Sequence, residues 1–341
     1  MASQNLAAWD VKEEDFPASG TMAEQLKFLL SYAVLAPAAH NAQPWRFSIQ
    51  GNGVAIRADR DRSLPVVDPD DRELHIGLGC ALANLLAAAE HFRLGYKVDL
   101  LPEGEDSDLA VAVEFTSQTR SPRFPDLLAV IPLRHTNRGK YEGRAIEPDK
   151  LLDLERCIDE ESIRLHLITE QEPKWQMADL VARGDYLQRA GKSFRRELAS
   201  WTRHNWTRAV DGMPGYAFGV SGIMALLRPF IVKTFDTGKS QGNNDRQLAN
   251  QAPALGVLTS SADDKPSWIR TGMLFEKLML VAAKLDIRLA HFNQPVEVPE
   301  LRQELCTLLG IEDYPQLLFR LGYASATKHT PRRPVNMSLA A

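Results

Sequence analysis

Residues able to hold an anion gather in two short motifs of this sequence. In Arg134-x-Thr136-x-Arg138 the polar residues alternate, so on an extended backbone their side chains point to one side. Two guanidinium groups and a hydroxyl group in this arrangement suit a phosphate or a polyol. The segment 328–334, KHTPRRP, is a second basic cluster that follows a predicted strand and could reach a phosphate. Taken alone, the first motif is more simply a solvated basic loop, and the second a basic tail.

Two further segments offer a bare backbone to a ligand. The run 36–47, APAAHNAQPWRF, follows an apolar helix pattern, turns at Pro37 and enters a strand near Trp45. Its small side chains would let a large flat ligand approach closely, and its polar groups would fix that ligand's edge. The run 291–299, HFNQPVEVP, contains Pro295 and Pro299, which we expect to hold it extended with backbone amides exposed. Both runs are also compatible with ordinary connections between elements.

Composition and missing motifs exclude several classes of function. The chain has 341 residues, of which 44% are hydrophobic and 25% charged, as in a soluble globular protein of about two domains. A net charge of −4 argues against nucleic acid as a partner. The sequence has no zinc-ligand cysteine spacing, no His-Glu-x-x-His and no Gly-x-Ser-x-Gly, so we expect neither a metal site nor a hydrolase. Without an export signal or an apolar stretch of about 20 residues, a cytoplasmic protein that does not cross a membrane is expected.

A regular series of predicted helices and strands positions these segments. Thr21 and Glu24 form a capping box at the start of the first helix, and Gly51-Asn52-Gly53 separates two alternating runs as in a hairpin. In the first half we predict a long helix at 75–94 and four strands, at 46–49, 54–58, 97–101 and 109–115. In the second half we predict three helices, one that starts at Pro148 and two at 175–188 and 268–289. We also predict three strands in this half, at 163–168, 255–258 and 317–321. The stretch 116–125 is predicted to be a linker.

An internal repeat relates the two long helices. Four residues of the first match four of the second at a single offset: Ile76, Gly79, Leu85 and Ala89 with Ile269, Gly272, Leu278 and Ala282. Because a similar order of elements surrounds both helices, duplication is favoured over chance. We therefore predict two halves, at 1–125 and 126–341. An insertion at about 194–253 is either a lid over a binding site or a peripheral helical appendage.

The four motifs occur in the order found in a known family. The run 36–47 is similar to the Pro-Ser-x-x-Asn-x-Gln-Pro-Trp segment of flavin-dependent nitroreductases, and 134–138 resembles their Arg-x-Ser/Thr-x-Arg segment. Asn293-Gln294-Pro295 and the ending at 331–334 are similar to the Acg-like branch, in which two nitroreductase-like halves are fused in one chain. The resemblance spans about 24–335. It implies an α+β nitroreductase-like fold whose two tandem halves form an intramolecular pseudo-dimer with a lid insertion.

The resemblance also implies one FMN per chain, held by residues of both halves. The basic side chains would neutralise the phosphate, Asn41 would hydrogen-bond the isoalloxazine edge, and the backbone around Gln294 would approach the flavin N5. Ala38 stands where the family usually has serine, which removes one hydroxyl contact. No catalytic acid or base is expected, because the flavin carries the chemistry. The implied cofactor-binding residues are Pro37, Ala38, Ala39, His40, Asn41, Gln43, Arg134, Thr136, Arg138, Asn293, Gln294, Pro295, Lys328, Arg332 and Arg333.

Three functions are compatible with the resemblance. The first is an FMN-binding oxidoreductase that transfers hydride from NAD(P)H to a small-molecule acceptor. The second is a lidded FMN-binding or sequestering protein with little or no turnover, since Trp201, Trp206 or Tyr216 of the insertion could close over the ring. The third is a structural protein without cofactor, against which the basic motifs argue. In all three cases we expect a monomer that acts as a pseudo-dimer.

Overall fold

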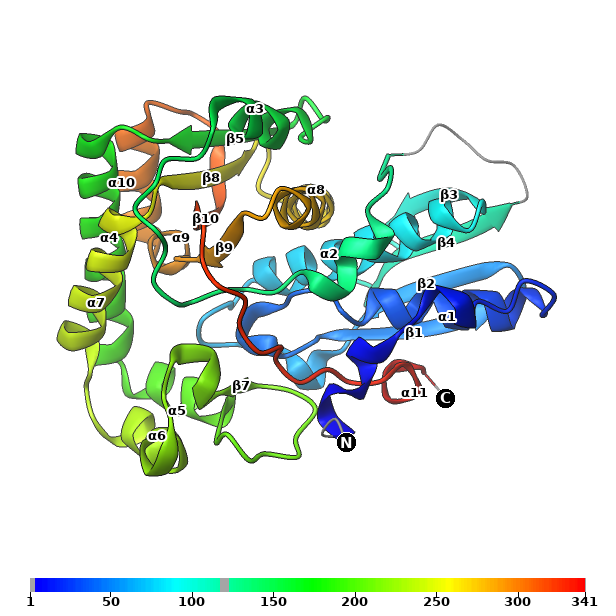
Figure 1. The fold of residues 1–341 in the computed structure, drawn as a ribbon, viewed down its shortest axis with the longest axis horizontal. Helices are drawn as coiled ribbons and strands as arrows, with labels where there is room; N and C mark the ends of the chain where they lie inside the picture. The colour runs from blue at the N-terminus through cyan, green and yellow to red at the C-terminus, as the bar shows by residue number, and fades with distance from the viewer. Residues whose placement is uncertain (1–3, 117–122, 341) are drawn as a thin grey trace.

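Two four-stranded antiparallel sheets of matching design form the framework of the computed structural model, which describes residues 4–116 and 123–340 (Figure 1). Six of the residues predicted to form a linker, 117–122, therefore lie outside the described part. The first sheet has the order β1-β2-β4-β3, with β1 (Trp45–Gln50), β2 (Gly53–Ala58), β3 (Gly95–Leu100) and β4 (Leu109–Thr116). The second has the order β5-β8-β10-β9, with β5 (Ile163–Ile168), β8 (Ala254–Ser260), β9 (Arg288–His291) and β10 (Tyr314–Gly322). The predicted α+β fold of two tandem halves is confirmed.

Local sequence signals act as predicted at the start of the chain. Helix α1 (Met22–Ala33) begins after Thr21, whose hydroxyl accepts the backbone N–H of Glu24, while the Glu24 carboxylate accepts the backbone N–H of Thr21 at 2.7 Å. This reciprocal pair satisfies two donors that a helix start otherwise leaves free. Between β1 and β2, Gly51 takes the left-handed conformation with φ of +59°, which a hairpin turn requires of one of its residues.

The two long helices cross at the centre of the molecule and join the halves. Helix α2 (Arg72–His91) and helix α8 (Lys265–Lys284) are buried over most of their length in one continuous hydrophobic core. A Cβ atom on Gly79 would lie 2.1 Å from the carbonyl oxygen of Ile269, and one on Gly272 would lie 2.0 Å from that of Ile76. The repeat found in the sequence therefore marks a pseudo-symmetric helix crossing at which only glycine fits.

Two boundaries differ from the prediction. The helix expected to run to 289 ends at Lys284, and Asp286, with φ of +61°, turns the chain into the unpredicted strand β9. The run 291–299 is not extended: it forms the short helix α9 (Gln294–Glu297) and leads into α10 (Pro299–Leu309). The expectation was wrong because Pro295 and Pro299 occupy first-turn positions, where a helix tolerates the missing N–H group.

The segment between α4 (Gln171–Ala190) and β8 divides into two parts (Figure 1). Residues 192–234, which we name the cover, contain α5 (Lys192–Ser200), the short strands β6 (Thr202–Arg203) and β7 (Met213–Pro214), and α6 (Gly222–Thr234). Helix α7 (Gly238–Gln251) instead packs along α4, and Ala249 on it belongs to the hydrophobic core of the second half.

The C-terminal tail returns to the first half of the molecule (Figure 1). After β10 the chain leaves the second sheet, and the backbone N–H of Ala340 donates to Phe47 of β1 at 2.7 Å. The tail ends in the short helix α11 (Val335–Ser338), and α3 (Pro148–Arg156) completes the helices of the second half. Across 4–116 and 123–340, no helix combines the length and apolar character needed to span a bilayer.

Candidate functional site

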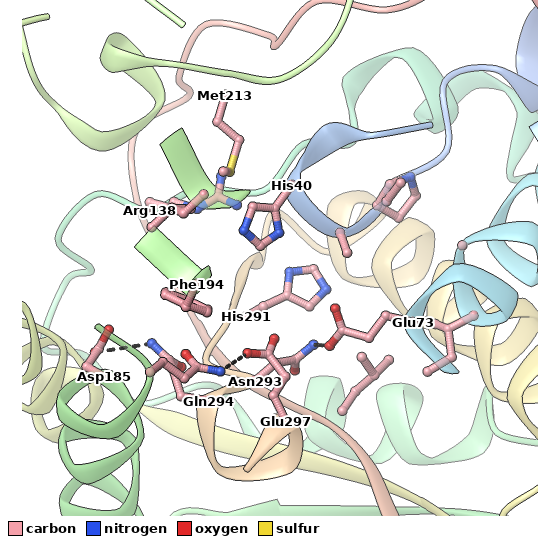
Figure 2. A pocket seen from close by; sticks show the side chains of 18 of the residues that line it. His40, Glu73, Arg138, Asp185, Phe194, Met213, His291, Asn293, Gln294 and Glu297 are labelled. Atoms are coloured by element: carbon pink, nitrogen blue, oxygen red, sulfur yellow. Dashed lines mark hydrogen bonds between the residues drawn. The ribbon is translucent and has the colours of Figure 1, made fainter. Parts of the chain in front are cut away.

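A cavity of about 190 Å³, here called the main cavity, collects segments from both halves and from the cover (Figure 2). The loop Pro37–His40 and the start of α2 come from the first half, and Arg138 and α9 come from the second. A side cavity of about 50 Å³ shares five of these lining residues: Pro37, Ala38, Arg138, Met213 and His291. Four motifs that are far apart in the sequence thus meet around two adjoining spaces.

The side-chain amide groups of Asn41 and Gln43, in the run 36–47, hydrogen-bond to neighbouring segments. Asn41, with φ of +56°, donates from its side chain to the carbonyl oxygens of Gly212 at 2.9 Å and Pro331 at 3.0 Å, and accepts from Arg332. Gln43 accepts the backbone N–H of Arg333 at 2.8 Å and donates to the cover. Ala38, Ala39 and His40 remain as the cavity wall. The two amides therefore hold the loop, the cover and the tail in register.

The residues of the Arg-x-Thr-x-Arg motif separate into two groups. Thr136 lines the side cavity, and Arg138 lines both cavities without a carboxylate partner in the described part of the chain. Its guanidinium lies 4.9 Å from the ring of Phe218, and burial lowers the pKa of Arg138 to about 10. Arg134 lines neither cavity: its Nε lies 3.2 Å from Glu276 on α8, and it donates to the carbonyl oxygen of Leu35.

The basic residues of the segment 328–334 also separate into two groups, those that line a cavity and one that does not. Lys328 and Arg332 line the side cavity, where Lys328 lies 4.8 Å from the ring of Tyr216 and burial lowers the pKa of Arg332 to about 9. The Nε atom of Arg332 is buried and has no hydrogen-bond partner among the described residues. Arg333 turns away from both cavities, donates to the carbonyl oxygen of Gln43 at 3.0 Å and lies 3.6 Å from Asp59. Among the described residues, four lysine or arginine side chains thus line the two spaces: Arg138, Lys328, Arg332 and Arg189, of which Arg189 is paired with Asp185 at 3.3 Å.

The predicted residues Asn293 and Gln294 form the floor of the main cavity together with carboxyl groups that no motif indicated (Figure 2). Asn293 donates to Glu73 at 2.7 Å, and Gln294 donates to Asp185 at 3.2 Å. Burial raises the pKa of Asp185 to about 7, and the neighbouring Asp245 carboxyl raises it further. Glu297, at the end of α9, also lines the cavity, whereas Pro295 is buried beside it. No spacing in the sequence relates these carboxyl groups, because they come from three different helices.

Two histidines on opposite segments stay neutral. Burial lowers the pKa of His40 to about 4 and that of His291 to about 3, and the nearby Arg138 guanidinium disfavours their charged forms further. His40 holds a left-handed backbone with φ of +50°. Neither ring therefore adds positive charge to the cavity near neutral pH; its arginines are Arg138 and Arg189, and Arg189 is paired with Asp185. Within the described ranges, no cluster of three or more potential ligands could hold a metal ion.

The cover closes over both cavities. Asp211 pairs with Arg62 of the first half at 3.1 Å, and the hydroxyl of Tyr216 donates to His329 of the tail at 2.9 Å. Apolar side chains from the cover line the main cavity: Phe194, Leu198, Met213 and Phe218. Trp206 is exposed to solvent, and Trp201 lines neither cavity, so the aromatic rings that the cover contributes to the main cavity are those of Phe194 and Phe218.

Comparison with known proteins agrees with this arrangement. No family model matches the chain. The chain is 25% identical over 324 residues to the Mycobacterium tuberculosis protein named "Putative NAD(P)H nitroreductase Rv3131", covering 92% of this chain and 90% of that one. It is 24% identical over 322 residues to "Putative NAD(P)H nitroreductase acg" of the same organism, covering 91% and 94%. The predicted resemblance to the Acg-like nitroreductases is confirmed.

These similarities extend across both halves. A third Mycobacterium tuberculosis protein, "Uncharacterized protein Rv3127", is 22% identical over 329 residues, with 92% of each chain covered. Among solved structures, the FMN-dependent nitroreductase NfnB of Mycobacterium smegmatis in complex with NADPH overlaps 61% of this chain and 94% of its own, at 12% identity and a TM-score of 0.40. Each of the three relatives therefore matches more than nine-tenths of this chain, a span that includes residues of both halves.

Proposed function

We propose that the protein is an FMN-dependent oxidoreductase that transfers hydride from NAD(P)H to a small-molecule acceptor. The observation that carries this proposal is Arg138, a half-buried guanidinium at the junction of the two cavities that forms no ion pair with any carboxylate of the described residues. A buried cation left unpaired is costly unless a ligand supplies the opposite charge. The relatives named as NAD(P)H nitroreductases support the same reaction class.

The residues around the two cavities fit FMN. A flat ring system suits the main cavity, whose wall at Ala38 and Ala39 carries only methyl groups. An anionic tail suits the side cavity, where Lys328 and Arg332 supply positive charge and no described residue hydrogen-bonds the Arg332 Nε atom. Thr136 and Thr330 add hydroxyl groups for the sugar-like chain between ring and phosphate. When bound, FMN would supply the reversible two-electron chemistry of its ring.

The protein's own residues would bind, orient and shield the reactants. Arg138, Lys328 and Arg332 would neutralise the cofactor, and the backbone at 37–40 and at Asn293–Gln294 would face the ring. Arg134, Arg333 and Gln43 would act one layer further out, because they line neither cavity and are bonded to protein groups. Asn41 lines the side cavity, while its amide group donates to Gly212 and Pro331. Ala38 in place of serine forgoes one neutral hydrogen bond, a loss of about 0.5–1.5 kcal/mol that leaves binding intact.

The cover favours a second candidate function. Its apolar lining and its ties to the first half would exclude water from the ring, and they would also restrict the entry of NAD(P)H. A flavin-sequestering protein with little turnover is therefore the alternative. Anaerobic mixing of the FMN-loaded protein with NADPH separates the two. Rapid bleaching of the yellow colour is expected for the reductase, and persistent colour would establish sequestration.

Replacement of Arg138 tests the cofactor site directly. Arg138→Gln removes this cation while keeping a polar side chain of similar length. Since charge-assisted hydrogen bonds contribute about 1.5–3 kcal/mol each, FMN should bind about 10- to 100-fold more weakly, as measured by fluorescence titration. Arg183→Gln, which removes an exposed arginine paired with Glu304 on the surface, is the matched control and should leave affinity unchanged. Unchanged affinity in Arg138→Gln would contradict the assigned site.

A further inference from the structure

Helix α6 of the cover exposes the side chains that a helix of a globular protein normally buries. Its buried residues are the smaller Ala225 and Val232, whereas its large apolar residues are turned to solvent. At 3.6 residues per turn, Ile223, Leu227 and Phe230 follow one line along the helix, and two more lie on either side of it. These five residues, here called the outer face, are 45–74% exposed: Ile223, Met224, Leu226, Leu227 and Phe230.

The described part of the chain leaves the outer face open. Helix α6 packs on α5 and β6, which belong to the cover itself, and it lies at the edge of the molecule, away from both four-stranded sheets (Figure 1). Phe235, just beyond the helix, is also exposed, and its ring centroid lies 6.4 Å from that of Phe230. Monomeric proteins rarely leave a large contiguous apolar surface in water, and such a surface marks a place where a protein or a membrane binds.

Charge distinguishes the cover from the rest of the chain. Residues 192–234 contain seven lysines and arginines against two acidic residues, whereas the other 298 residues contain 33 against 42. The cover therefore has a formal charge of +5 in a chain whose net charge is −4. Because salt screens exposed charges beyond about 10 Å, the charge of the cover itself decides what approaches the outer face.

Both acidic residues of the cover are engaged with the protein. Glu197 accepts two backbone N–H groups of the first half at 2.9 Å each, and Asp211 pairs with Arg62 at 3.1 Å. The cover thus offers apolar side chains and positive charge to solvent, without a free carboxylate. Four of its cations, here called the free cations, are exposed and form no ion pair with the described residues: Lys192, Arg196, Arg208 and Lys233.

This combination favours an anionic lipid surface as the partner of the cover. A second copy of the chain that docked by the same face would bring two formal charges of +5 together. A bilayer with anionic headgroups suits both features at once, because its phosphates attract lysine and arginine and its acyl region takes up apolar side chains. With 13 residues, α6 is shorter than the roughly 20 residues that span a bilayer, so it would lie in the plane of the surface.

We propose that the cover docks on the surface of an anionic lipid bilayer through the outer face of α6. The apolar side chains enter the boundary between headgroups and acyl chains, and the free cations contact the lipid phosphates. Arg228, on the opposite side of α6, stays with the protein: its guanidinium lies 3.7 Å from the ring of Phe218, which lines the main cavity. The docked helix thus touches the wall of the candidate site. The proposal does not depend on the assignment of the cofactor.

Cosedimentation of the whole protein with lipid vesicles tests the docking. Binding is expected to vesicles of phosphatidylcholine mixed with phosphatidylglycerol, and much weaker binding to vesicles of phosphatidylcholine alone. High salt should weaken binding to the mixed vesicles, because it screens the attraction between exposed charges. Equal binding to both kinds of vesicle would overturn the proposal. Binding to neither would also overturn it, and would leave an acidic protein as the partner that the charge of the cover suits.

Leu227→Gln combined with Phe230→Gln tests the outer face. Both side chains are exposed, so the unfolding free energy in urea should stay close to that of the unaltered protein. Affinity for the mixed vesicles should fall about tenfold or more, because two apolar side chains no longer enter the lipid. Leu152→Gln, the same change on an exposed leucine of α3, is the matched control and should keep its affinity. Unchanged binding of the double variant would contradict docking through α6.

A charge variant and a measurement without lipid complete the test. Lys233→Gln should weaken binding to the mixed vesicles about fivefold, whereas Lys97→Gln, which removes an exposed lysine of β3, should not. Equal binding by these two variants would show that the charge of the cover has no part in docking. Light scattering without lipid should give a monomer. A dimer that Leu227→Gln with Phe230→Gln abolishes would assign the outer face to a second copy and overturn the proposal.

Discussion

Arg134 and Arg138 stand four positions apart in one motif, yet their surroundings give them different roles. Arg134 is 2% exposed and is compensated inside the protein by Glu276, which is fully buried. Arg138 has no such partner in the described part of the chain and faces both cavities. The first arginine therefore stabilises the packing between the motif and α8, and the second is available to a ligand. Alternation alone does not distinguish them, because the deciding carboxylate lies far along the sequence.

Removal of Arg134 should destabilise the protein in a pH-dependent way. Burial raises the pKa of Glu276 to about 7, and Arg134 opposes this shift. Without the arginine the folded-state pKa rises further, so ionising Glu276 costs folding free energy at a pH where the unaltered protein tolerates it. Arg134→Met should lose about 3 kcal/mol of unfolding free energy at pH 8.5 and clearly less at pH 6. Urea denaturation at both pH values measures this, and an equal loss at both would contradict the assignment.

The sequence motifs indicated residues that lie beside the cavities, but they did not indicate which side chains bond to one another. The small side chains at 37–39 and the cations at Arg138, Lys328 and Arg332 lie beside one cavity system, and their role in binding a cofactor stays a prediction. The sequence did not indicate that the Asn41 amide group bonds to the tail and the cover. It also did not indicate Glu73 or Glu297. These facts depend on which helices meet, and no local spacing encodes that.

At the scale of elements, the crossing of α2 and α8 fixes the relation between the halves. Gly79 and Gly272 let the two backbones touch, and the Sγ of Cys80 lies 3.2 Å from the carbonyl oxygen of Gly272. The sequence showed these glycines as a repeat but not as a contact. The helices at the crossing also carry cavity residues such as Gly77 and Phe275, so any shift there would change the site.

A methyl group at this crossing should be strongly destabilising. In Gly79→Ala the new Cβ would lie 2.1 Å from a backbone carbonyl oxygen, which cannot rotate away as a side chain could. We expect a loss of about 3 kcal/mol or more in chemical denaturation. Gly77→Ala on the same helix is the control: its nearest neighbour would be 3.7 Å away, and alanine has the higher helix propensity. Equal stability of the two variants would show that the helices can separate without cost.

The cover should respond to loss of its ion pairs. Asp211 bonds Arg62 of the first half at 3.1 Å and Arg203 of the cover at 2.9 Å. Asp211→Asn weakens both ties while leaving the residues that face the cavities in place. Anaerobic bleaching by NADPH should accelerate several-fold at unchanged FMN content, because the cover opens more often. Asp179→Asn, which removes a surface pair with Arg246, is the control. A slower reaction in Asp211→Asn would instead indicate that the closed cover is needed for hydride transfer.

Elements were predicted well where their signals are local. The capping box, the hairpin glycine and the long apolar helices all appear within a few residues of their expected positions. Strand β9 was missed because the apolar pattern of α8 continues into it, and only the left-handed Asp286 marks the break. Prolines at 295 and 299 were taken as signs of extended chain, but at a helix start they are equally favourable.

At the scale of the whole molecule, the pseudo-symmetry is incomplete in a way that bears on stoichiometry. The two sheets have matching strand orders, and the two long helices cross at equivalent glycines. The loops that enter the sheets differ. Residues 34–44 separate α1 from β1 and form the wall of the main cavity, whereas only residues 157–162 separate α3 from β5. The shorter loop cannot reproduce the bare wall with its left-handed residues, so the second half offers no equivalent of 37–40.

The composite arrangement therefore predicts one FMN for each monomer. The first half would supply the wall at 37–40, and the second half the cations at Arg138, Lys328 and Arg332, so a single chain completes the site. Titration of FMN-free protein should end at a ratio of one, and light scattering should give the mass of a monomer at that point. Affinity should not change on dilution, because no second chain has to associate. An end point of two, or FMN release on dilution of the protein, would mean that a site between separate chains exists and that the pseudo-dimer is not the functional unit.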